Sequence, residues 1–157
     1  MKNILFMGAM LLCVQVASAQ RFVTNEVDPF TGVRCVVSAF ERTGKGTDFM
    51  YISTFYIGGQ TGLYLQAGRD VGCAGVTGNK FMILCTDGTV INCGEDLGQI
   101  DCADDATSIY TIDAEKLSGK SIMKLRLEQS NGYIDADWTM NQTLYQFIKF
   151  AENAQLP

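Results

Sequence analysis

The sequence contains no histidine among its 157 residues. This absence excludes Ser-His and Cys-His nucleophile pairs, and it removes both a common metal ligand and the usual base near neutral pH. Mechanisms that use carboxylates alone remain open. We therefore expect no catalytic residue, no metal site and no cofactor, and the acidic side chains are weighed individually below.

Other patterns are missing as well. No C-x-x-C spacing occurs, so neither a thioredoxin-like redox pair nor a typical zinc knuckle is indicated. Beyond residue 19 no apolar run approaches the roughly 20 residues of a membrane-spanning helix. The chain has 12 Lys and Arg against 17 Asp and Glu, whereas nucleic-acid affinity depends mainly on neutralising phosphates. Neither a membrane span in the mature chain nor a nucleic-acid partner is expected.

The first residues have the layout of a secretory signal peptide. One positive charge precedes an apolar run over residues 4–14, and Ala17-Ser18-Ala19 fits the A-x-A pattern that signal peptidase accepts. The alternative is a buried N-terminal helix. We expect residues 1–19 to be removed and a secreted or periplasmic protein to begin at Gln20, with residues 20–157 forming a single β-rich domain.

Strand-like segments dominate that domain. They are rich in Val, Ile, Thr, Phe and Tyr, and glycine-containing breaks such as Thr43-Gly44-Lys45-Gly46 separate them. The eight expected strands cover residues 33–40, 49–57, 63–67, 80–84, 89–93, 108–112, 122–128 and 133–140. Their number and spacing predict a mainly β fold, either an antiparallel β-sandwich or a partly open barrel. A short helix near 114–118, capped by Asp113, and a C-terminal helix from Asn141 are also expected.

Two hairpins can be written out residue by residue. With Asn131-Gly132 as the turn of the first, Leu127 faces Ala136 and an apolar stripe forms on one side. That stripe comprises Met123, Leu125, Leu127, Ala136, Trp138 and Met140. On the other side Lys124 opposes Thr139, Arg126 opposes Asp137, and Glu128 opposes Asp135. With Asp87-Gly88 as the second turn, Cys85 lies opposite Val90, and Cys85 and Cys93 project from opposite faces.

Five cysteines follow residue 19. An oxidising compartment favours their pairing, and an odd number leaves at least one of them reduced. We expect Cys102 to bond either Cys93 or Cys73, because all three gather at the open end of the Asp87-Gly88 hairpin. Cys85 is expected to be a buried free thiol.

Asp135, Asp137 and Glu128 are the candidate ligand-binding residues. Carboxylates on one strand face suit a divalent cation or an acid/base pair. The alternative, which we favour, is a solvated charge ladder in which Arg126 and Lys124 offset the negative charges. A second acidic group, Glu95, Asp96, Asp101, Asp104 and Asp105, lacks the spacing of a calcium-binding EF-hand loop and is interpreted as a solvated loop.

Aromatic residues are concentrated on two neighbouring expected strands: Phe49, Tyr51, Phe55, Tyr56 and Tyr64. A strand that is apolar on both faces is normally buried, which favours a core position. The alternative is an exposed platform for a glycan or a protein partner.

Several short motifs resemble those of small exported proteins of unknown function from Bacteroidetes-type bacteria. They are Asp28-Pro29-Phe30-Thr31-Gly32, Asp87-Gly88-Thr89-Val90-Ile91, the series Tyr110, Ile112, Glu115 and Leu117, and Ile122 to Leu127 followed by Gly132-Tyr133-Ile134-Asp135. The resemblance covers most of the mature chain and implies bacterial export and a β-rich fold. It implies no activity and no catalytic residue.

Three functions follow as hypotheses. The first is an exported binding or structural module for an unknown protein or glycan partner. The second is an enzyme-inhibitor-like protein in which the loop Gly72–Gly78 inserts into a cleft. The third, and the least favoured, is a carboxylate-dependent hydrolase that uses Asp135 and Asp137.

Overall fold

The computed structural model describes residues 20–154, so the expected signal peptide lies outside the described residues. Ten strands form two antiparallel sheets, as expected for a β-sandwich. The larger sheet contains β1 (Phe22–Val27), β2 (Arg34–Ser38), β3 (Glu41–Lys45), β4 (Asp48–Ile57), β5 (Gln60–Ala67) and β8 (Ser108–Thr111). The smaller sheet has the order β10 (Gly132–Asp137), β9 (Ile122–Gln129), β6 (Lys80–Cys85) and β7 (Val90–Glu95).

The core lies between the two sheets because alternate side chains of each strand point to the same face. In the larger sheet β4 contributes Met50 and Ile52, which are fully buried. In the smaller sheet Phe81 and Ile83 of β6 are buried in the same cluster. The intervening residues of β6 and β9 are only partly buried, so the smaller sheet has one apolar inner face and one outer face that solvent reaches.

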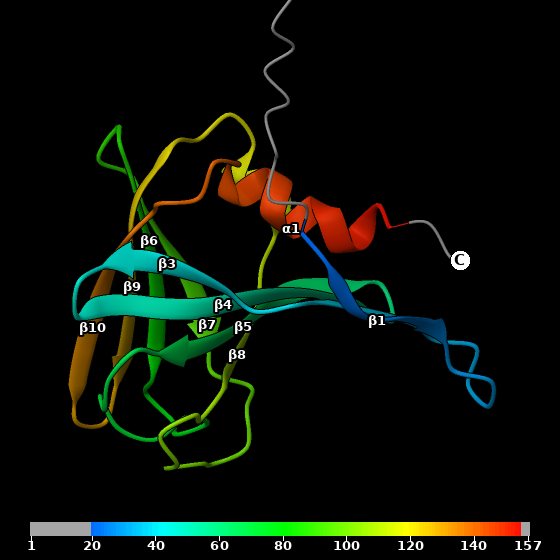
Figure 1. Cartoon of the computed structure of the whole chain (residues 1–157), viewed down its shortest axis with the longest axis horizontal. Coiled ribbons are helices and arrows are strands. Elements are labelled where there is room, and N and C mark those ends of the chain that lie inside the picture. Colours follow the sequence, from blue (N-terminus) through cyan, green and yellow to red (C-terminus); the bar gives the residue numbers. More distant parts are fainter. Residues whose placement is uncertain (1–19, 155–157) are drawn as a thin grey trace, which may run out of the picture.

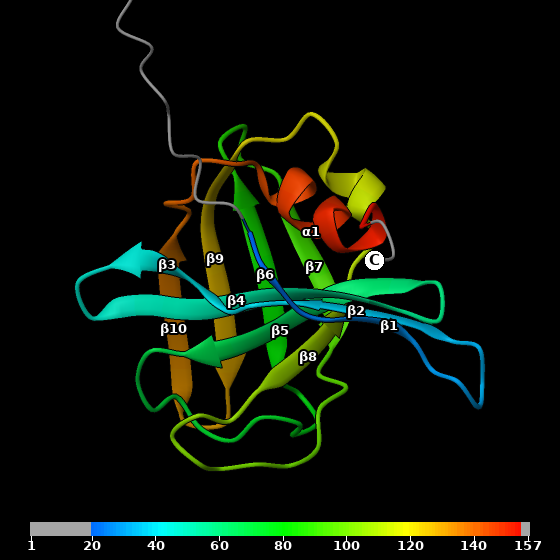
Figure 2. The same cartoon turned by 45° about the vertical axis from the view of Figure 1, so that its right-hand side comes forward.

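Helix α1 (Leu144–Glu152) lies across one end of the sandwich, beside the short 3₁₀ helix η1 (Ala114–Leu117), as Figures 1 and 2 show. Its buried side chains are Leu144, Phe147, Ile148 and Ala151. Both expected helices are therefore confirmed. The cap of α1 differs from the expectation, because Thr143 forms a capping box with Gln146 and the helix does not begin at Asn141.

Two strands of the larger sheet were not predicted. Residues 22–27 and 41–45 form β1 and β3, which lie outside the eight expected strands, and β3 includes part of the expected break at Thr43-Gly44-Lys45-Gly46. Gly44 lies inside β3 with φ +102°, and a Cβ there would lie 2.3 Å from the backbone oxygen of Asp48. The glycine is thus required by a close approach between β3 and β4, and the turn itself begins at Gly46.

The β9–β10 hairpin keeps the predicted faces with a different register. Leu125 pairs with Ala136 and Leu127 pairs with Ile134, which is a shift of two residues from the expectation. Such a shift preserves which side chains share a face. The apolar stripe is nevertheless shorter than predicted, because Met123 is 47% exposed and Trp138 lies beyond the end of β10.

The β6–β7 hairpin differs from the prediction by one residue. Leu84, and not Cys85, pairs with Val90. Cys85 is buried on the inner face of β6, and Cys93 also packs against the core, so the prediction that these two side chains lie on opposite faces was wrong. Both are free thiols, because Cys73 and Cys102 form the disulfide. That pairing is one of the two expected for Cys102, and Cys85 is the buried free thiol that was predicted.

Among residues 20–154, no helix is both long and apolar enough to cross a membrane.

Candidate functional site

The outer face of the smaller sheet carries two rows of side chains that run across its strands. In the first row Val90 of β7 lies beside Leu84 of β6, followed by Lys124 of β9 and Asp137 of β10. The second row runs from Asn92 through Met82 and Arg126 to Asp135. The β6–β7 half of this face is therefore apolar apart from Asn92 at its edge, and the β9–β10 half is charged.

These two halves enclose a hollow of about 350 Å³. Its lining consists of Met82, Leu84, Val90, Met123, Lys124, Arg126 and Asp135. This volume lies at the lower end of the roughly 300–1,000 Å³ found for ligand pockets. The hollow thus suits a small group, such as one aromatic ring.

A β-bulge supplies one wall of the hollow. Leu84 pairs with Lys124 whereas Cys85 pairs with Ile122, so β9 has one extra residue at this point, Met123. The extra residue turns Met123 outward, where it is 47% exposed. Val90 on the edge strand β7 is 53% exposed at the other side of the hollow. Neither Met123 nor Val90 was predicted to line a site, because each was expected to belong to a regular hairpin.

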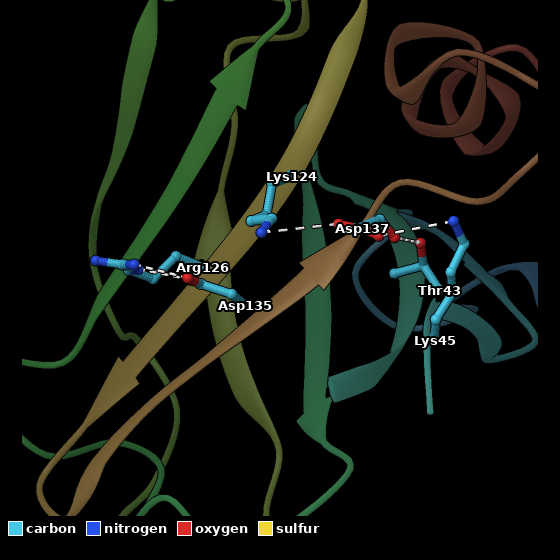
Figure 3. A network of polar contacts seen from close by, with 6 residues as sticks. All are labelled: Thr43, Lys45, Lys124, Arg126, Asp135 and Asp137. Atoms are coloured by element: carbon cyan, nitrogen blue, oxygen red, sulfur yellow. Dashed lines mark hydrogen bonds and ion pairs between the residues drawn. The ribbon is translucent and has the colours of Figure 1, made fainter. Parts of the chain in front are cut away.

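Arg126 and Asp135 form a bidentate ion pair at the rim, as Figure 3 shows. Nε and one terminal nitrogen of Arg126 donate to the two carboxylate oxygens over 2.6 and 2.7 Å. The guanidinium also lies 4.3 Å from the centre of the Tyr133 ring. The hydrogen bond from Arg126 lowers the pKa of the Asp135 carboxyl. The carboxylate therefore remains ionised, and both of its oxygens accept hydrogen bonds from Arg126.

Asp137 lies between two lysines and outside the hollow. Each of its carboxylate oxygens is 3.8 Å from an ammonium group, one from Lys124 and the other from Lys45 of β3 (Figure 3). The Thr43 hydroxyl donates to the backbone oxygen of Asp137 over 2.8 Å, which ties the two sheets together at this corner. The contact fixes the backbone of the site at the end of β10.

The three candidate carboxylates do not gather in one site. In the register of the hairpin Arg126 opposes Asp135, Lys124 opposes Asp137 and Glu128 opposes Tyr133. The predicted like-charge pair of Glu128 and Asp135 is therefore wrong. Opposite charges face each other instead, and the carboxylate paired with Arg126 is that of Asp135. Within residues 20–154, no cluster of three or more Cys, Asp or Glu side chains is arranged to hold a metal ion.

One residue of the second acidic group has a structural role that the sequence did not indicate. The carboxylate of Asp96 accepts five hydrogen bonds, at 2.6–3.1 Å. The donors are the backbone amides of Gly75, Gly98 and Ile109 and the side chains of Asn79 and Ser108. Burial raises the pKa of Asp96, but these hydrogen bonds outweigh it and lower the pKa overall. The expectation that Asp96 belongs to a solvated loop was wrong.

The loop Gly72–Gly78 lies against the body of the protein. The disulfide of Cys73, a backbone pairing of Ala74 with Asp101, and the hydrogen bond from Gly75 to Asp96 all hold it there. Ala74 is fully buried. This loop therefore does not project as an inhibitory loop would.

The aromatic residues of β4 and β5 divide between core and surface. Phe55 is buried and packs against Tyr64, with ring centres 4.8 Å apart. Tyr51 is exposed, and its ring contacts Phe49 edge-on. Arg42 covers the Phe49 ring at 4.1 Å from its centre, which leaves little open aromatic surface for a glycan platform.

Comparisons with protein-family models, curated proteins and solved structures found no match for this chain. The candidate site is the shallow hollow on the outer face of the smaller sheet, which has an apolar half and a charged rim. It belongs to a small β-sandwich with a disulfide between Cys73 and Cys102.

Proposed function

We propose that this chain is an exported binding module without catalytic function, and that its ligand occupies the hollow on the outer face of the smaller sheet. The observation that carries the proposal is the division of the lining into apolar side chains of β6, β7 and the β9 bulge and charged side chains of β9 and β10. Such a site suits a ligand with an apolar group and a polar or charged group at one end.

The charge at the rim of the hollow determines which sign of charge the polar end of the ligand should carry. Lys124, Arg126 and the neighbouring Lys45 contribute three positive charges. Asp135, paired with Arg126, and Asp137, shared between the two lysines, contribute two negative charges. The excess is positive, so an anionic group is favoured next to Lys124. The proposed ligand class is therefore an apolar group that carries a carboxylate or a comparable anion.

The paired state of Asp135 supports binding over hydrolysis. A hydrolase that works with two carboxylates needs one of them protonated as the acid and both directed at the scissile bond. Asp135 has a lowered pKa and two hydrogen bonds to Arg126, and Asp137 does not line the hollow. The inhibitor hypothesis also loses support, because the loop Gly72–Gly78 is held against the body.

The test is a titration of the purified protein with 3-phenylpropionate, a probe that joins one aromatic ring to a carboxylate. The ε-methyl NMR signals of Met82 and Met123 should shift and saturate, since both methionines line the hollow. Val90→Glu should weaken the affinity at least tenfold, because it places a carboxylate beside the apolar lining. The uncharged analogue 3-phenylpropanol should bind several-fold more weakly, because it lacks the partner for Lys124.

Two matched controls keep this test specific. Ile100→Glu changes another exposed apolar residue, outside the hollow, and should leave the affinity unchanged. Asp137→Asn removes the carboxylate that competes with the probe for Lys124, so this variant should bind the probe at least as tightly as the wild type. If Val90→Glu binds the probe as the wild type does, the hollow is not the ligand site and the proposal fails.

A further inference from the structure

The hairpin formed by β1 and β2 projects from the sandwich on the side away from β9 and β10 (Figure 1). Phe30 lies in its turn and is 95% exposed, the highest value among the exposed large apolar residues of the described chain. Val27 and Val33, on either side of the turn, are also exposed. An aromatic side chain placed this far from the core contributes nothing to core packing, and exposed aromatic residues are frequent anchors of protein interfaces.

The turn that carries Phe30 is rigidly built. The Asp28 carboxylate accepts hydrogen bonds from the backbone amides of Phe30 and Thr31 over 2.9 and 2.7 Å. The Gly32 amide donates to the Asp28 backbone oxygen over 2.8 Å, and Gly32 has φ +69°, which favours glycine. These bonds fix the backbone around Phe30, so little backbone conformational entropy is lost when the tip enters a pocket.

The tip also carries negative charge. Glu26 and Asp28 flank the turn and are exposed, and the backbone hydrogen bond from Thr31 helps to lower the pKa of Asp28. Arg34, the nearest cation in the hairpin, is directed toward the end of α1, where it donates to the backbone oxygens of Glu152 and Ala154. The tip thus presents one aromatic ring with a surplus of negative charge around it.

These properties complement those of the hollow on the smaller sheet. The hollow has a volume of about 350 Å³ and an apolar half that suits one ring. At its charged side Lys45, Lys124 and Arg126 exceed Asp135 and Asp137 by one positive charge. We propose that the hollow receives the hairpin tip of a second copy of this chain, with Phe30 against the apolar side chains and Glu26 and Asp28 beside Lys124 and Arg126. This inference rests on the proposed function, because it names the partner of that binding site.

The geometry makes this contact heterologous. The tip belongs to the larger sheet and points away from β9 and β10 (Figure 1), whereas the hollow is lined by β6, β7, β9 and β10 of the smaller sheet, so one molecule does not fill its own site. Each copy instead offers a tip to one neighbour and a hollow to the other. Repetition of such a contact produces a ring or an open linear assembly. Because the contact surface is small, the association should be weak, in the range of transient interfaces.

The experiment is a complementation test by analytical ultracentrifugation. The wild-type protein should gain mass as its concentration rises from about 10 to 500 µM, since interfaces below roughly 1,200 Å² are typical of weak association. Phe30→Ser removes the tip and Val90→Glu obstructs the hollow, and each variant alone should remain monomeric. An equimolar mixture of the two retains one intact tip and one intact hollow, so it should form a heterodimer and nothing larger. Because both substitutions lie at exposed positions, both variants should fold.

Val23→Glu distinguishes this contact from pairing between two β1 edges. Val23 lies on the edge strand and is 67% exposed, so a charge there should disrupt edge pairing and leave the tip contact unchanged. The proposal is overturned if the wild type stays monomeric over the whole range, if Val23→Glu abolishes assembly, or if the mixture of the two variants stays monomeric. Phe30→Ser should still bind 3-phenylpropionate. If the wild type binds 3-phenylpropionate in the hollow but does not assemble, only the self-association is refuted. If Val90→Glu binds 3-phenylpropionate as tightly as the wild type, the binding site itself is refuted.

Discussion

Replacement of Asp96 by Asn should destabilise the protein by about 3 kcal/mol. An amide keeps one acceptor oxygen and turns the other into a donor, so at least two of the five donors around this carboxylate lose their partner. A buried donor left without an acceptor costs about 1–3 kcal/mol, and two losses of about 1.5 kcal/mol each, in the lower half of that range because Asp96 is only partly buried, give the stated figure. This is a large share of the 5–15 kcal/mol that stabilises a typical domain.

The effect can be measured by urea unfolding, followed through the fluorescence of the single tryptophan, Trp138. With an m value near 1.5 kcal/mol/M, the midpoint of Asp96→Asn should fall by about 2 M. Glu95→Gln is the matched control, because the neighbouring carboxylate is exposed and its replacement should change stability by less than about 0.5 kcal/mol. Equal midpoints for the two variants at pH 7 would refute the role assigned to Asp96.

The pH dependence gives a second readout of the same carboxylate. The pKa of Asp96 is lowered in the folded protein, so its contribution is fully present above the unfolded pKa of about 3.9. That contribution is lost as the pH falls through the lower folded pKa. The difference in stability between wild type and Asp96→Asn should therefore be constant near neutral pH and shrink below about pH 4.

Three further predictions concern the rest of the fold. Replacing Cys73 and Cys102 by Ser should cost about 3–4 kcal/mol in urea unfolding, from the 29-residue separation of the disulfide in the chain-entropy model; a change below 1 kcal/mol would contradict it. Trp138→Ala should cost about 2–3 kcal/mol by circular dichroism, less than the roughly 3–5 of a fully buried aromatic residue, because Trp138 is half-buried against Phe147; an unchanged stability would show that the contact is dispensable. Thr143→Ala should cost about 1 kcal/mol through loss of the capping box and lower the melting temperature by a few degrees, with Thr143→Ser as the control that keeps the cap.

The sequence predicted the fold class and the core better than the pairing of the strands. Alternation of apolar side chains determines which residues share a face, and a register shift of two leaves those faces unchanged. Leu125, Leu127 and Ala136 are therefore buried as predicted, although each has a different partner from the one expected. At the other hairpin the shift was one residue, and the predicted face of Cys93 was wrong.

The candidate site was only partly predictable for a related reason. Asp135 was recognised from its charge, but its pairing with Arg126 alone depends on the register. The apolar half of the hollow needs Met82 and Val90 from a different hairpin and a bulge at Met123, none of which leaves a local pattern in the sequence. Strand β1 was missed because Thr24, Asn25 and Glu26 interrupt its apolar residues, and β3 was missed because Glu41–Lys45 contains no apolar side chain.

The position of α1 has a consequence for the order in which the protein can be completed. The helix occupies the end of the sandwich, and Leu144, Phe147, Ile148 and Ala151 are fully buried there although they follow both sheets in the sequence. A ribosome releases α1 after β10, so every nascent chain passes through a stage in which both sheets have been synthesised and the core is still open at one end. Such intermediates expose apolar surface and are prone to aggregate. The synthesis of α1 therefore sets the time at which this apolar surface can be covered.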